Sequence, residues 1–222
     1  MVAPLPCAIL IPSLGRPKRL RDVVANIHAN TPEDHYIAFC VADSESRGIL
    51  DELGEWYLDD SDIEDHRYVT RMNALVRQAD DAPTLFFGSD DVIFHPGWLS
   101  EALRVMDGGP DVVVVNDLHN RSGTQALMRA SYLPRAVFDS PGDAFHGGYV
   151  HNFADTEQFF TAGKLGVLDR AMDSIVEHLH PVFGFSNALK WDDTYLNARA
   201  GWKHDEELFL KRRAMIERWA VT

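Results

Sequence analysis

The sequence has 222 residues, of which 45% are hydrophobic and 25% charged, and its formal net charge at pH 7 is -13. This length and composition are typical of a soluble globular domain, and the acidic balance argues against a protein whose affinity comes from neutralising nucleic-acid phosphates. The two cysteines, Cys7 and Cys40, lie within apolar runs, which indicates buried reduced thiols rather than a disulfide framework.

Membrane insertion and secretion are not expected either. No apolar run approaches the ~18 residues that a membrane span needs. The short apolar run near the N-terminus has no basic segment before it, which argues against a signal peptide. We therefore expect a cytoplasmic protein without a membrane partner.

The first elements predict a β-α-β unit. Residues 8–12 are a compact apolar run that ends in turn residues, and residues 36–42 are a second run of the same kind. Between them, residues 18–30 place apolar side chains at the spacing of an amphipathic helix. Two strands joined in this way are expected to be parallel.

The alternation of strands and helices continues to residue 116. The acidic segment 44–66 is weakly patterned, with a short helix expected over 49–57. The next expected elements are a helix at 68–78, a strand at 84–87, a helix at 97–106 and a strand at 111–116. Such alternation predicts an α/β layered fold with a mostly parallel central sheet flanked by helices.

The pattern is less regular after residue 118. We expect a strand and a short helix within 123–138, a Gly-rich loop over 139–153, a helix at 155–163, a strand at 174–183 and a closing helix at 205–219. The sequence contains no internal repeat and no linker, so we predict one domain over residues 1–222.

Three of the expected strands end in polar residues. These are Ser13 and Arg16 after the first strand, Asp43 after the second, and Ser89, Asp90 and Asp91 after the third. Ligands of open parallel sheets bind at the carboxyl ends of the strands. We therefore expect these side chains to lie along one edge of the sheet and to form a binding site.

Asp90 and Asp91 have two interpretations. Carboxylate oxygens suit Mg²⁺ or Mn²⁺, and such ions commonly bridge to substrate phosphates. The alternative is a pair of turn or helix-capping residues, since Asp is favoured in both positions. There is no Walker-type or GxGxxG loop, so a Gly-rich phosphate cradle is not supported.

Four segments together resemble the family-2 type glycosyltransferases of the GT-A (Rossmann-like) fold. The similarity spans about residues 8 to 195, and its segments are "ILIPSLGRPKRLRDVVANI", "IAFCVAD", "RMNALVRQADDAPTLFFGSDDVIFHPGWLSEAL" and "FHGGYVHNFADTEQFFTAGKLG". The resemblance implies a metal-dependent, inverting hexosyltransferase (EC 2.4) that uses Mn²⁺ or Mg²⁺. Its donor would be a nucleotide-diphosphate sugar, with a UDP-sugar favoured, and its acceptor would carry a hydroxyl group.

The resemblance also assigns residues to the donor site. Pro12, Ser13 and Arg16 match the residues that line the nucleotide site, and Asp43 matches the contact to the base or ribose. Arg71 and Asn73 match an Arg and an Asn on the helix before the metal motif. The Asp-x-Asp motif itself matches Ser89-Asp90-Asp91, so Asp91 is the expected metal ligand, and Asp90 is left open between ribose, sugar and metal.

The general base of the family lies in a Glu-Asp pair at the start of a helix. Here the pair is Ala154-Asp155, so Asp155 is the expected base and Glu157 the runner-up. A positioned carboxylate can take the proton of the attacking hydroxyl, and a bound cation can neutralise the departing diphosphate.

The remaining site residues lie late in the chain. Alternation places Val176, His178 and His180 on one face of a strand. Some members of the fold complete the metal coordination with a His late in the chain. On this resemblance His180 is the expected ligand and His178 the alternative. A structural role remains open for both. The acceptor side is assigned to Gly147, Gly148, His151 and Trp191, and the segment 191–195 is interpreted as a lid, an acceptor wall or part of the core.

On this interpretation, residues 1–117 form a nucleotide-binding half, 118–204 an acceptor and catalytic half, and 205–222 a C-terminal helix. A nucleotidyltransferase of similar fold is one alternative, although the first loop lacks the expected glycines. A non-catalytic nucleotide- or sugar-binding module is another, supported by Ser89 and Ala154 where the family has carboxylates. The acceptor is expected to be a small molecule, glycan or protein rather than a nucleic acid.

Overall fold

The first three elements form the predicted β-α-β unit. The computed structural model describes residues 7–63, 65–79, 81–119, 123–184 and 188–220. It begins with β1 (Cys7–Ser13), α1 (Pro17–Asn30) and β2 (His35–Val41). β1 and β2 are parallel, which confirms the prediction. The first six residues, part of the segment tested as a signal peptide, lie outside the described residues.

The segment after β2 differs from the prediction. It contains α2 (Ser44–Leu53), β3 (Trp56–Asp59) and the 3-10 turn η1 (Asp60–Asp62). The expected helix over 49–57 is wrong at both ends, because Asp43 caps α2 through the backbone amide and hydroxyl of Ser46, and Gly54 ends the helix with a left-handed φ of 73°. Only glycine adopts that conformation without strain, so β3 can start directly after it.

The predicted helix at 68–78 and the predicted strand at 84–87 are confirmed as α3 (Tyr68–Gln78) and β4 (Thr84–Phe87). The remaining elements are β5 (Val92–Phe94), α4 (Trp98–Asp107), β6 (Val112–Asn116), β7 (Ala126–Arg129), η2 (Ala130–Tyr132), α5 (Leu133–Ala136), α6 (Ala154–Lys164), β8 (Leu168–His178), η3 (Pro181–Phe183), α7 (Asp193–Ala200) and α8 (Trp202–Trp219). β8 starts earlier and ends earlier than the predicted strand, α7 was not predicted, and α8 begins at Trp202 rather than at residue 205.

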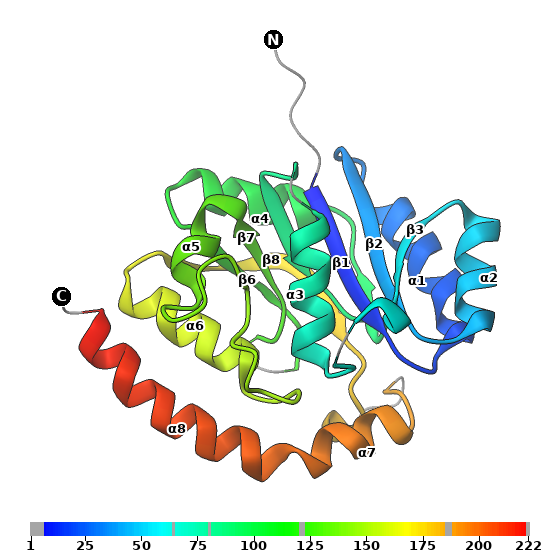
Figure 1. Cartoon of the computed structure of the whole chain (residues 1–222). Helices are drawn as coiled ribbons and strands as arrows, with labels where there is room; N and C mark the ends of the chain where they lie inside the picture. The colour runs from blue at the N-terminus through cyan, green and yellow to red at the C-terminus, as the bar shows by residue number, and fades with distance from the viewer. Residues whose placement is uncertain (1–6, 64, 80, 120–122, 185–187, 221–222) are drawn as a thin grey trace.

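The strands form one mixed sheet in the order β3-β2-β1-β4-β7-β6-β8-β5. β3, β2, β1 and β4 are parallel neighbours, and so are β6 and β8. β7 is antiparallel to both β4 and β6, and β5 is antiparallel to β8. The predicted α/β fold with a mostly parallel sheet is confirmed (Figure 1).

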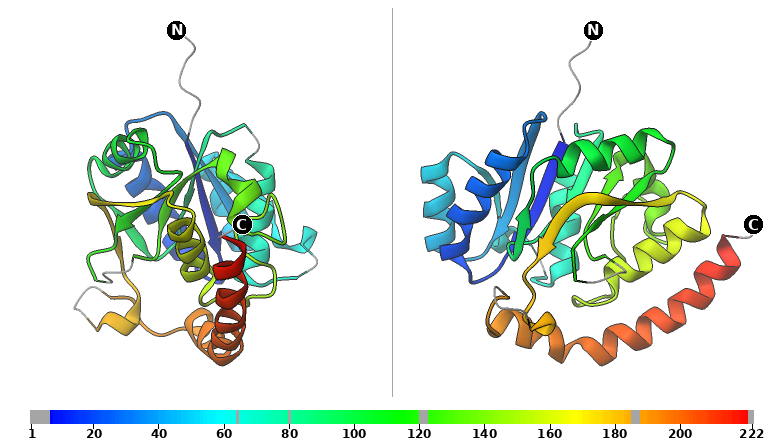
Figure 2. Two further views of the ribbon diagram at one scale, coloured as in Figure 1. Left: turned by 90° about the vertical axis from the view of Figure 1, so that its left-hand side faces the viewer. Right: turned by 180° about the vertical axis from the view of Figure 1, so that it is seen from behind.

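Helices cover both faces of the sheet, and each face has its own core (Figure 2). Alternate strand residues such as Ile9 and Ile11 pack under α1, α2 and α4. Their neighbours, such as Ala8 and Leu10, pack under α3 and α6. Cys7 and Cys40 are free and buried among these residues, as predicted, and burial raises the pKa of each thiol to about 12.

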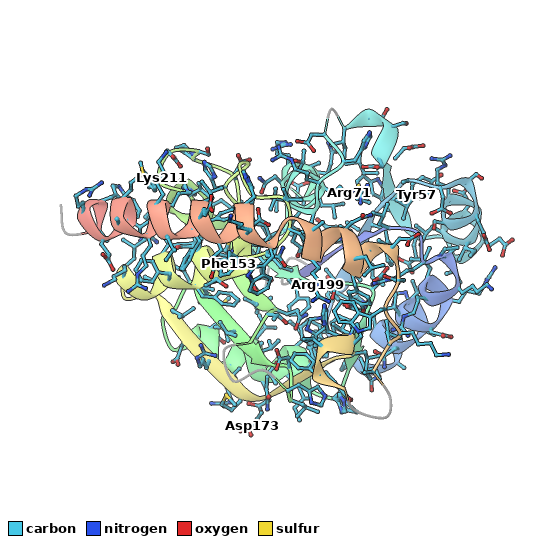
Figure 3. All side chains as sticks on the ribbon, turned by 90° about the horizontal axis from the view of Figure 1, so that it is seen from below. Tyr57, Arg71, Phe153, Asp173, Arg199 and Lys211 are labelled. Atoms are coloured by element: carbon cyan, nitrogen blue, oxygen red, sulfur yellow. The ribbon has the colours of Figure 1, made fainter. Side chains whose placement is uncertain are left out.

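The last two helices lie at the carboxyl ends of the parallel strands. In Figure 1 the arrowhead of β1 points down towards α7, and α8 runs along the lower side of the molecule. Figure 3 shows α7 and α8 following one another across this edge, with Phe153 beside the start of α8 and Arg199 on α7. In the described ranges, no helix combines the length and apolar character required to cross a bilayer.

Candidate active site

A cleft of about 530 Å³ lies at the carboxyl edge of β1 and β4. Its walls come from the end of β1, the start of α3, residues 87–91, residues 150–156, the end of β8 and α7. Open α/β sheets bind ligands at this edge, where the ends of parallel strands leave polar groups in a crevice. The cleft therefore lies where the sequence placed a site.

Arg16 connects the beginning and the end of the chain in this cleft. Its Nη1 lies 2.7 Å from Oδ1 of Asp90, and its Nε and Nη2 donate to the two carboxylate oxygens of Asp192 at 2.7 and 3.0 Å. The guanidinium also lies over the ring of Tyr195, 4.1 Å from the centroid. Ser13 donates to the second oxygen of Asp90 at 2.6 Å, so the structure brings Ser13, Arg16 and Asp90 together.

Asp91 points to a different set of partners. Ser89 donates to its Oδ1 at 2.5 Å, and the hydroxyl of Tyr195 donates to its Oδ2 at 2.8 Å. Nε2 of His178 lies 3.3 Å from the same Oδ2. Burial opposes the charge of Asp91, but His178, Ser89 and Arg16 together outweigh it and hold the pKa of Asp91 well below its usual range. For Asp90, burial outweighs Arg16 and raises the pKa.

The two histidines have separate roles in the structure. β8 ends at His178, so His180 does not continue its face, and the predicted strand over 174–183 is wrong there. His180 instead caps η3 by accepting from the amide of Val182, and its ring packs on Tyr195 with the centroids 4.5 Å apart. The contact to Asp91 is made by His178, whose Nδ1 lies 3.1 Å from the hydroxyl oxygen of Thr124. Burial opposes the charged form of His178, yet Asp91 prevails and raises the pKa.

Asp91 and His178 fit a divalent cation in their donor chemistry. A carboxylate oxygen and an imidazole nitrogen, 3.3 Å apart at the cleft, suit Mn²⁺ and are compatible with Mg²⁺. Across the described residues, no group of three or more His, Cys, Asp or Glu side chains could hold a metal ion. A cation held here would complete its coordination with water and substrate oxygens, as ions at phosphate-transfer sites do.

Asp155 also lines the cleft. It lies in the first turn of α6, and its Oδ1 accepts from the amide of Thr156 at 2.7 Å. Burial raises the pKa of this carboxyl group. Next to it, burial lowers the pKa of His151 to about 4, and the ring of His151 packs on Tyr68 at 4.7 Å.

Glu157 does not line the cleft. Its carboxylate is buried on the other side of α6, where it pairs with Arg212 at 2.8 Å and accepts from the hydroxyl of Tyr149 at 2.5 Å. Of the two candidate bases, the structure places only Asp155 at the cleft.

The other predicted donor-site residues are held by protein partners. Pro12 and Arg71 line the cleft, and Arg71 makes two hydrogen bonds to Asp60 at 2.8 and 2.7 Å. Asp43 is the cap of α2 and does not line the cleft. Asn73 points away from it and holds the backbone of Ala144 and Phe145 through its amide group.

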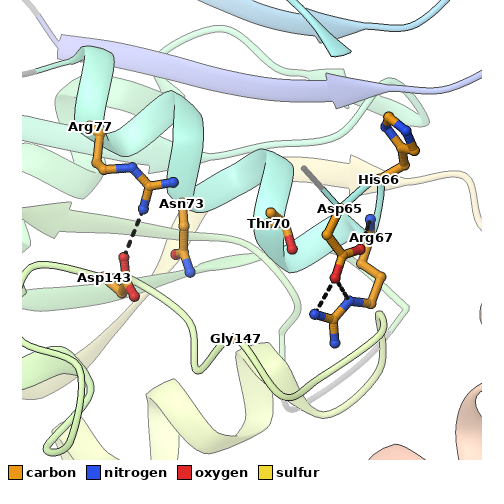
Figure 4. A pocket seen from close by; sticks show the side chains of 8 residues that line it. All are labelled: Asp65, His66, Arg67, Thr70, Asn73, Arg77, Asp143 and Gly147. Atoms are coloured by element: carbon orange, nitrogen blue, oxygen red, sulfur yellow. Dashed lines mark hydrogen bonds and ion pairs between the residues drawn. The ribbon is translucent and has the colours of Figure 1, made fainter. Parts of the chain in front are cut away.

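A second hollow of about 700 Å³ adjoins the cleft and shares His66 and Arg67 with it. Figure 4 shows Thr70, Asn73 and Arg77 of α3 on one side and Gly147 with Asp143 on the other. Its arginines are paired, Arg77 with Asp143 at 3.0 Å and Arg67 with Asp65. Gly147 thus faces this hollow.

Of the other three residues assigned to the acceptor side, His151 lines the cleft, whereas Gly148 and Trp191 do not. Gly148 packs closely, since an added Cβ would come within 2.8 Å of the His146 ring and 3.0 Å of Leu208. Trp191 is exposed, and its ring lies 6.0 Å from those of both His180 and Tyr195, which line the cleft.

Several residues that line or support the cleft are not assigned by the sequence. Tyr195 lines the cleft, and Asp192 pairs with Arg16 beside it; both lie in the segment 191–195, which the sequence leaves open between a lid, an acceptor wall and part of the core. Gln125 has no signal in the sequence, since a single glutamine before a strand is not informative. Asp205, which the sequence places at the start of the closing helix without a further role, is fully buried and accepts from the amides of residues 150, 151 and 152.

The fold is that of the GT-A class, the fold of nucleotide-sugar-dependent glycosyltransferases. Solved structures match over most of the chain. Glucosyl-3-phosphoglycerate synthase from Mycobacterium tuberculosis, in complex with Mn²⁺, UDP-Glc and phosphoglyceric acid, matches with a TM-score of 0.66 and 11% identity over 95% of this chain and 80% of that one. A mannosyltransferase from Pyrobaculum calidifontis, in complex with GDP-Man and Mn²⁺, matches with a TM-score of 0.63 and 11% identity over 97% of this chain and 72% of that one. No protein-family model matches the sequence, and no curated protein does so either.

Proposed function

We propose that the protein is a metal-dependent glycosyltransferase that moves a sugar from a nucleoside-diphosphate sugar to a hydroxyl-bearing acceptor. The observation that carries the proposal is the pair of Asp91 and His178, 3.3 Å apart, in the same cleft as Asp155. A pair that can bind a cation and a carboxylate of raised pKa, both in one cleft, are the two parts that this reaction needs.

The donor would bind along the end of β1 and the residues after β4. Pro12, Ser13 and Asp90 would contact the nucleotide and its ribose, and Asp91 with His178 would hold Mn²⁺ or Mg²⁺. When bound, the ion neutralises charge on the departing diphosphate. Complexes of the similar structures contain GDP-Man with Mn²⁺ and UDP-Glc with Mn²⁺, which supports this class of donor, and we favour a UDP-sugar.

The acceptor would approach from the side of residues 150–156. Asp155 would take the proton of the acceptor hydroxyl while that oxygen attacks the anomeric carbon. The bond from this carbon to the diphosphate oxygen breaks, and its electron pair leaves with the diphosphate. A single displacement of this kind inverts the anomeric configuration, which NMR of the product would show. The raised pKa of Asp155 brings the base closer to neutral pH, where proton transfer is more efficient.

The proposal is tested by ligand-dependent thermal stability of the wild-type protein, Asp91→Asn, His178→Ala and the control Asp22→Asn. Asp22 is an exposed carboxylate on α1, away from the cleft. UDP-glucose and GDP-mannose are each added with and without Mn²⁺. A ligand at about 100 times its Kd stabilises a protein by about 2.7 kcal/mol, which raises the Tm of a chain of this size by about 5–10 °C.

We expect a shift that requires Mn²⁺ in the wild type and in Asp22→Asn, and its loss in the two cleft variants. Circular dichroism of the unliganded variants confirms that they are folded. A metal-dependent shift that persists in Asp91→Asn would contradict the metal assignment. Absence of any nucleotide shift in the wild type would reject the glycosyltransferase, and binding without transfer to any acceptor would favour a non-catalytic module. Release of diphosphate instead of a nucleoside diphosphate would identify a nucleotidyltransferase.

A further inference from the structure

Gln125 carries a buried oxygen without a hydrogen-bond partner. Its side chain lines the cleft and is 4% exposed. Among the described residues, its Oε1 is one of three buried side-chain atoms without a partner; the other two, in Glu33 and Tyr132, belong to residues outside the cleft lining. An unpaired acceptor at the wall of a binding cleft indicates that a ligand supplies the donor.

The energetic cost makes this oxygen informative. A buried acceptor without a donor destabilises a fold by about 1–3 kcal/mol. Native structures retain few such groups, and those that they retain need an explanation. A hydroxyl group of a substrate would donate to Oε1 only when the substrate is bound. The destabilisation of the free protein is then relieved only by a substrate that has this hydroxyl group, which favours that substrate over others.

The sheet register locates Gln125 beside the metal-binding pair. β7 is antiparallel to β4, and the last pair at this end joins Ala126 to Phe87. Gln125 precedes that pair and therefore lies next to Gly88, just before the Ser89-Asp90-Asp91 segment. Its neighbour Thr124 has its hydroxyl oxygen 3.1 Å from Nδ1 of His178. A sugar attached to a diphosphate at Asp91 and His178 would lie against this part of the wall.

We propose that Oε1 of Gln125 accepts a hydrogen bond from a ring hydroxyl of the sugar that is transferred. This inference rests on the proposed function and specifies which part of the donor the residue recognises. It recognises the sugar and not the nucleotide, since it immediately precedes β7, and β4 separates β7 from β1 in the sheet. A site built to pair with a hydroxyl group discriminates strongly against ligands that lack it, because its own buried group is then left unpaired.

The test compares Gln125→Met with the matched control Tyr132→Phe. Methionine has nearly the shape of glutamine but carries no amide. Tyr132→Phe removes another buried oxygen without a hydrogen-bond partner, a hydroxyl group that lies outside the cleft. Since each change removes an unpaired buried group, we expect the Tm of both unliganded variants to be unchanged or higher than that of the wild type.

Binding is measured by calorimetry in Mn²⁺ with UDP, UDP-glucose, GDP and GDP-mannose. For the nucleotide that the wild type binds, we expect Gln125→Met to keep the affinity for the bare diphosphate and to bind the sugar-bearing form about 5- to 50-fold more weakly, the range that one hydrogen bond to a buried group produces. Tyr132→Phe is expected to keep both affinities.

Two results with Gln125→Met would overturn the inference. One is that the ratio of the affinity for the nucleoside diphosphate to the affinity for the nucleotide sugar is the same as in the wild type, with both affinities kept. The other is an equal loss of affinity for both compounds, which would place Gln125 at the nucleotide. A wild type that binds none of the four compounds rejects the proposed function and with it the inference. Failure of the proposed function is therefore seen in the wild-type protein, whereas failure of the inference alone is seen only in Gln125→Met.

Discussion

Asp90 and Asp91 are neighbours in the chain, but they bind different parts of the molecule. Asp90 pairs with Ser13 and Arg16 at the end of β1, whereas Asp91 faces His178 and Tyr195 from the other end of the chain. The sequence predicted that the two carboxylates mark a site. It could not predict this division, because the partners are 74 residues away for Arg16 and 104 for Tyr195.

The contacts of His178 and His180 could not be predicted from the local sequence either. Strand alternation was assumed to continue to His180, but the strand ends at His178, and the turn that follows rotates His180 towards Tyr195. Where a strand ends depends on how long its partner continues. β5, the partner here, is only three residues long and pairs its Val92 with His178. Such tertiary information is absent from the local pattern.

At the scale of one residue, Asp155→Asn tests the base. We expect the transfer rate to fall by about 10²- to 10⁴-fold with nucleotide binding unchanged, because the amide cannot take the proton. Because its folded pKa is raised, Asp155 binds a proton more tightly in the folded than in the unfolded state, so it lowers the stability at neutral pH and this cost disappears as the pH falls. The variant should therefore be at least as stable as the wild type at pH 7, as thermal denaturation would show.

The pH dependence gives an independent check of this assignment. A base must be ionised to act, so the wild-type rate should decline as the pH falls through a pKa above the ordinary range of Asp. A variant Asp155→Asn that keeps the wild-type rate, or a wild-type rate that has not declined when the pH reaches the ordinary pKa of Asp, would rule out this base.

At the scale of elements, Asp205 joins α8 to the segment that leads to Asp155, the proposed base. Its Oδ1 accepts from the amide of Val150, and its Oδ2 accepts from those of His151 and Asn152. The next residue, Phe153, has a left-handed φ of 62° and begins α6, where Asp155 lies. One buried carboxylate therefore fixes the backbone that leads to Asp155, although the two residues are on different helices.

We expect Asp205→Asn to lower the stability by about 1.5–3 kcal/mol, since hydrogen bonds to a charged acceptor are replaced by weaker ones and the new amide group faces N–H donors. Chemical denaturation measures this loss, and hydrogen exchange at residues 150–152 should be faster. The control Glu206→Gln changes an exposed carboxylate of the same turn and should alter neither. Unchanged exchange at these amides in Asp205→Asn would contradict the assigned role.

The elements themselves were predictable to different degrees. α1, α3 and β1 have clear apolar patterns, and their positions follow from them. α7 buries only Tyr195 and Ala198, so it has no apolar stripe that a pattern could reveal. It is held instead by Asp192, which caps it and also binds Arg16. Elements that are stabilised mainly by tertiary ion pairs leave little trace in the local sequence.

At the scale of the whole molecule, the alternation of strands and helices was sufficient to predict the fold class. The order of the strands was not predictable, because β7 inserts antiparallel between β4 and β6 and comes later in the chain than both. This insertion is also what brings Gln125 to the cleft.

The attachment of α8 to the rest of the molecule depends on a buried ion pair. Arg212 and Glu157 are each 3% exposed, and Arg212 also pairs with Asp139 at 2.8 Å. We expect Arg212→Met to lower the free energy of unfolding by about 3–5 kcal/mol, because Glu157 then stays buried without its partner. The double variant Arg212→Met/Glu157→Leu should recover part of this loss.

The control for this prediction is Arg213→Met on the same helix. Arg213 pairs with Glu217 on the surface, where an ion pair contributes about 0–1 kcal/mol. Urea denaturation of all three variants gives the comparison. Equal losses for Arg212→Met and Arg213→Met would show that the buried pair does not anchor α8.

The contact between Arg16 and Asp192 has a consequence for the order in which the protein is made. The two residues are 176 positions apart, so the chain from Arg16 to Asp192 must have left the ribosome before the cleft can close. Domains tend to fold from the N-terminal side during synthesis, and the sheet from β1 to β4 can pair well before α7 exists. A nascent chain that ends before Asp192 would already contain Arg16 and both carboxylates, but it would lack Tyr195 and one wall of the cleft. The cleft is therefore completed only after α7 has been made.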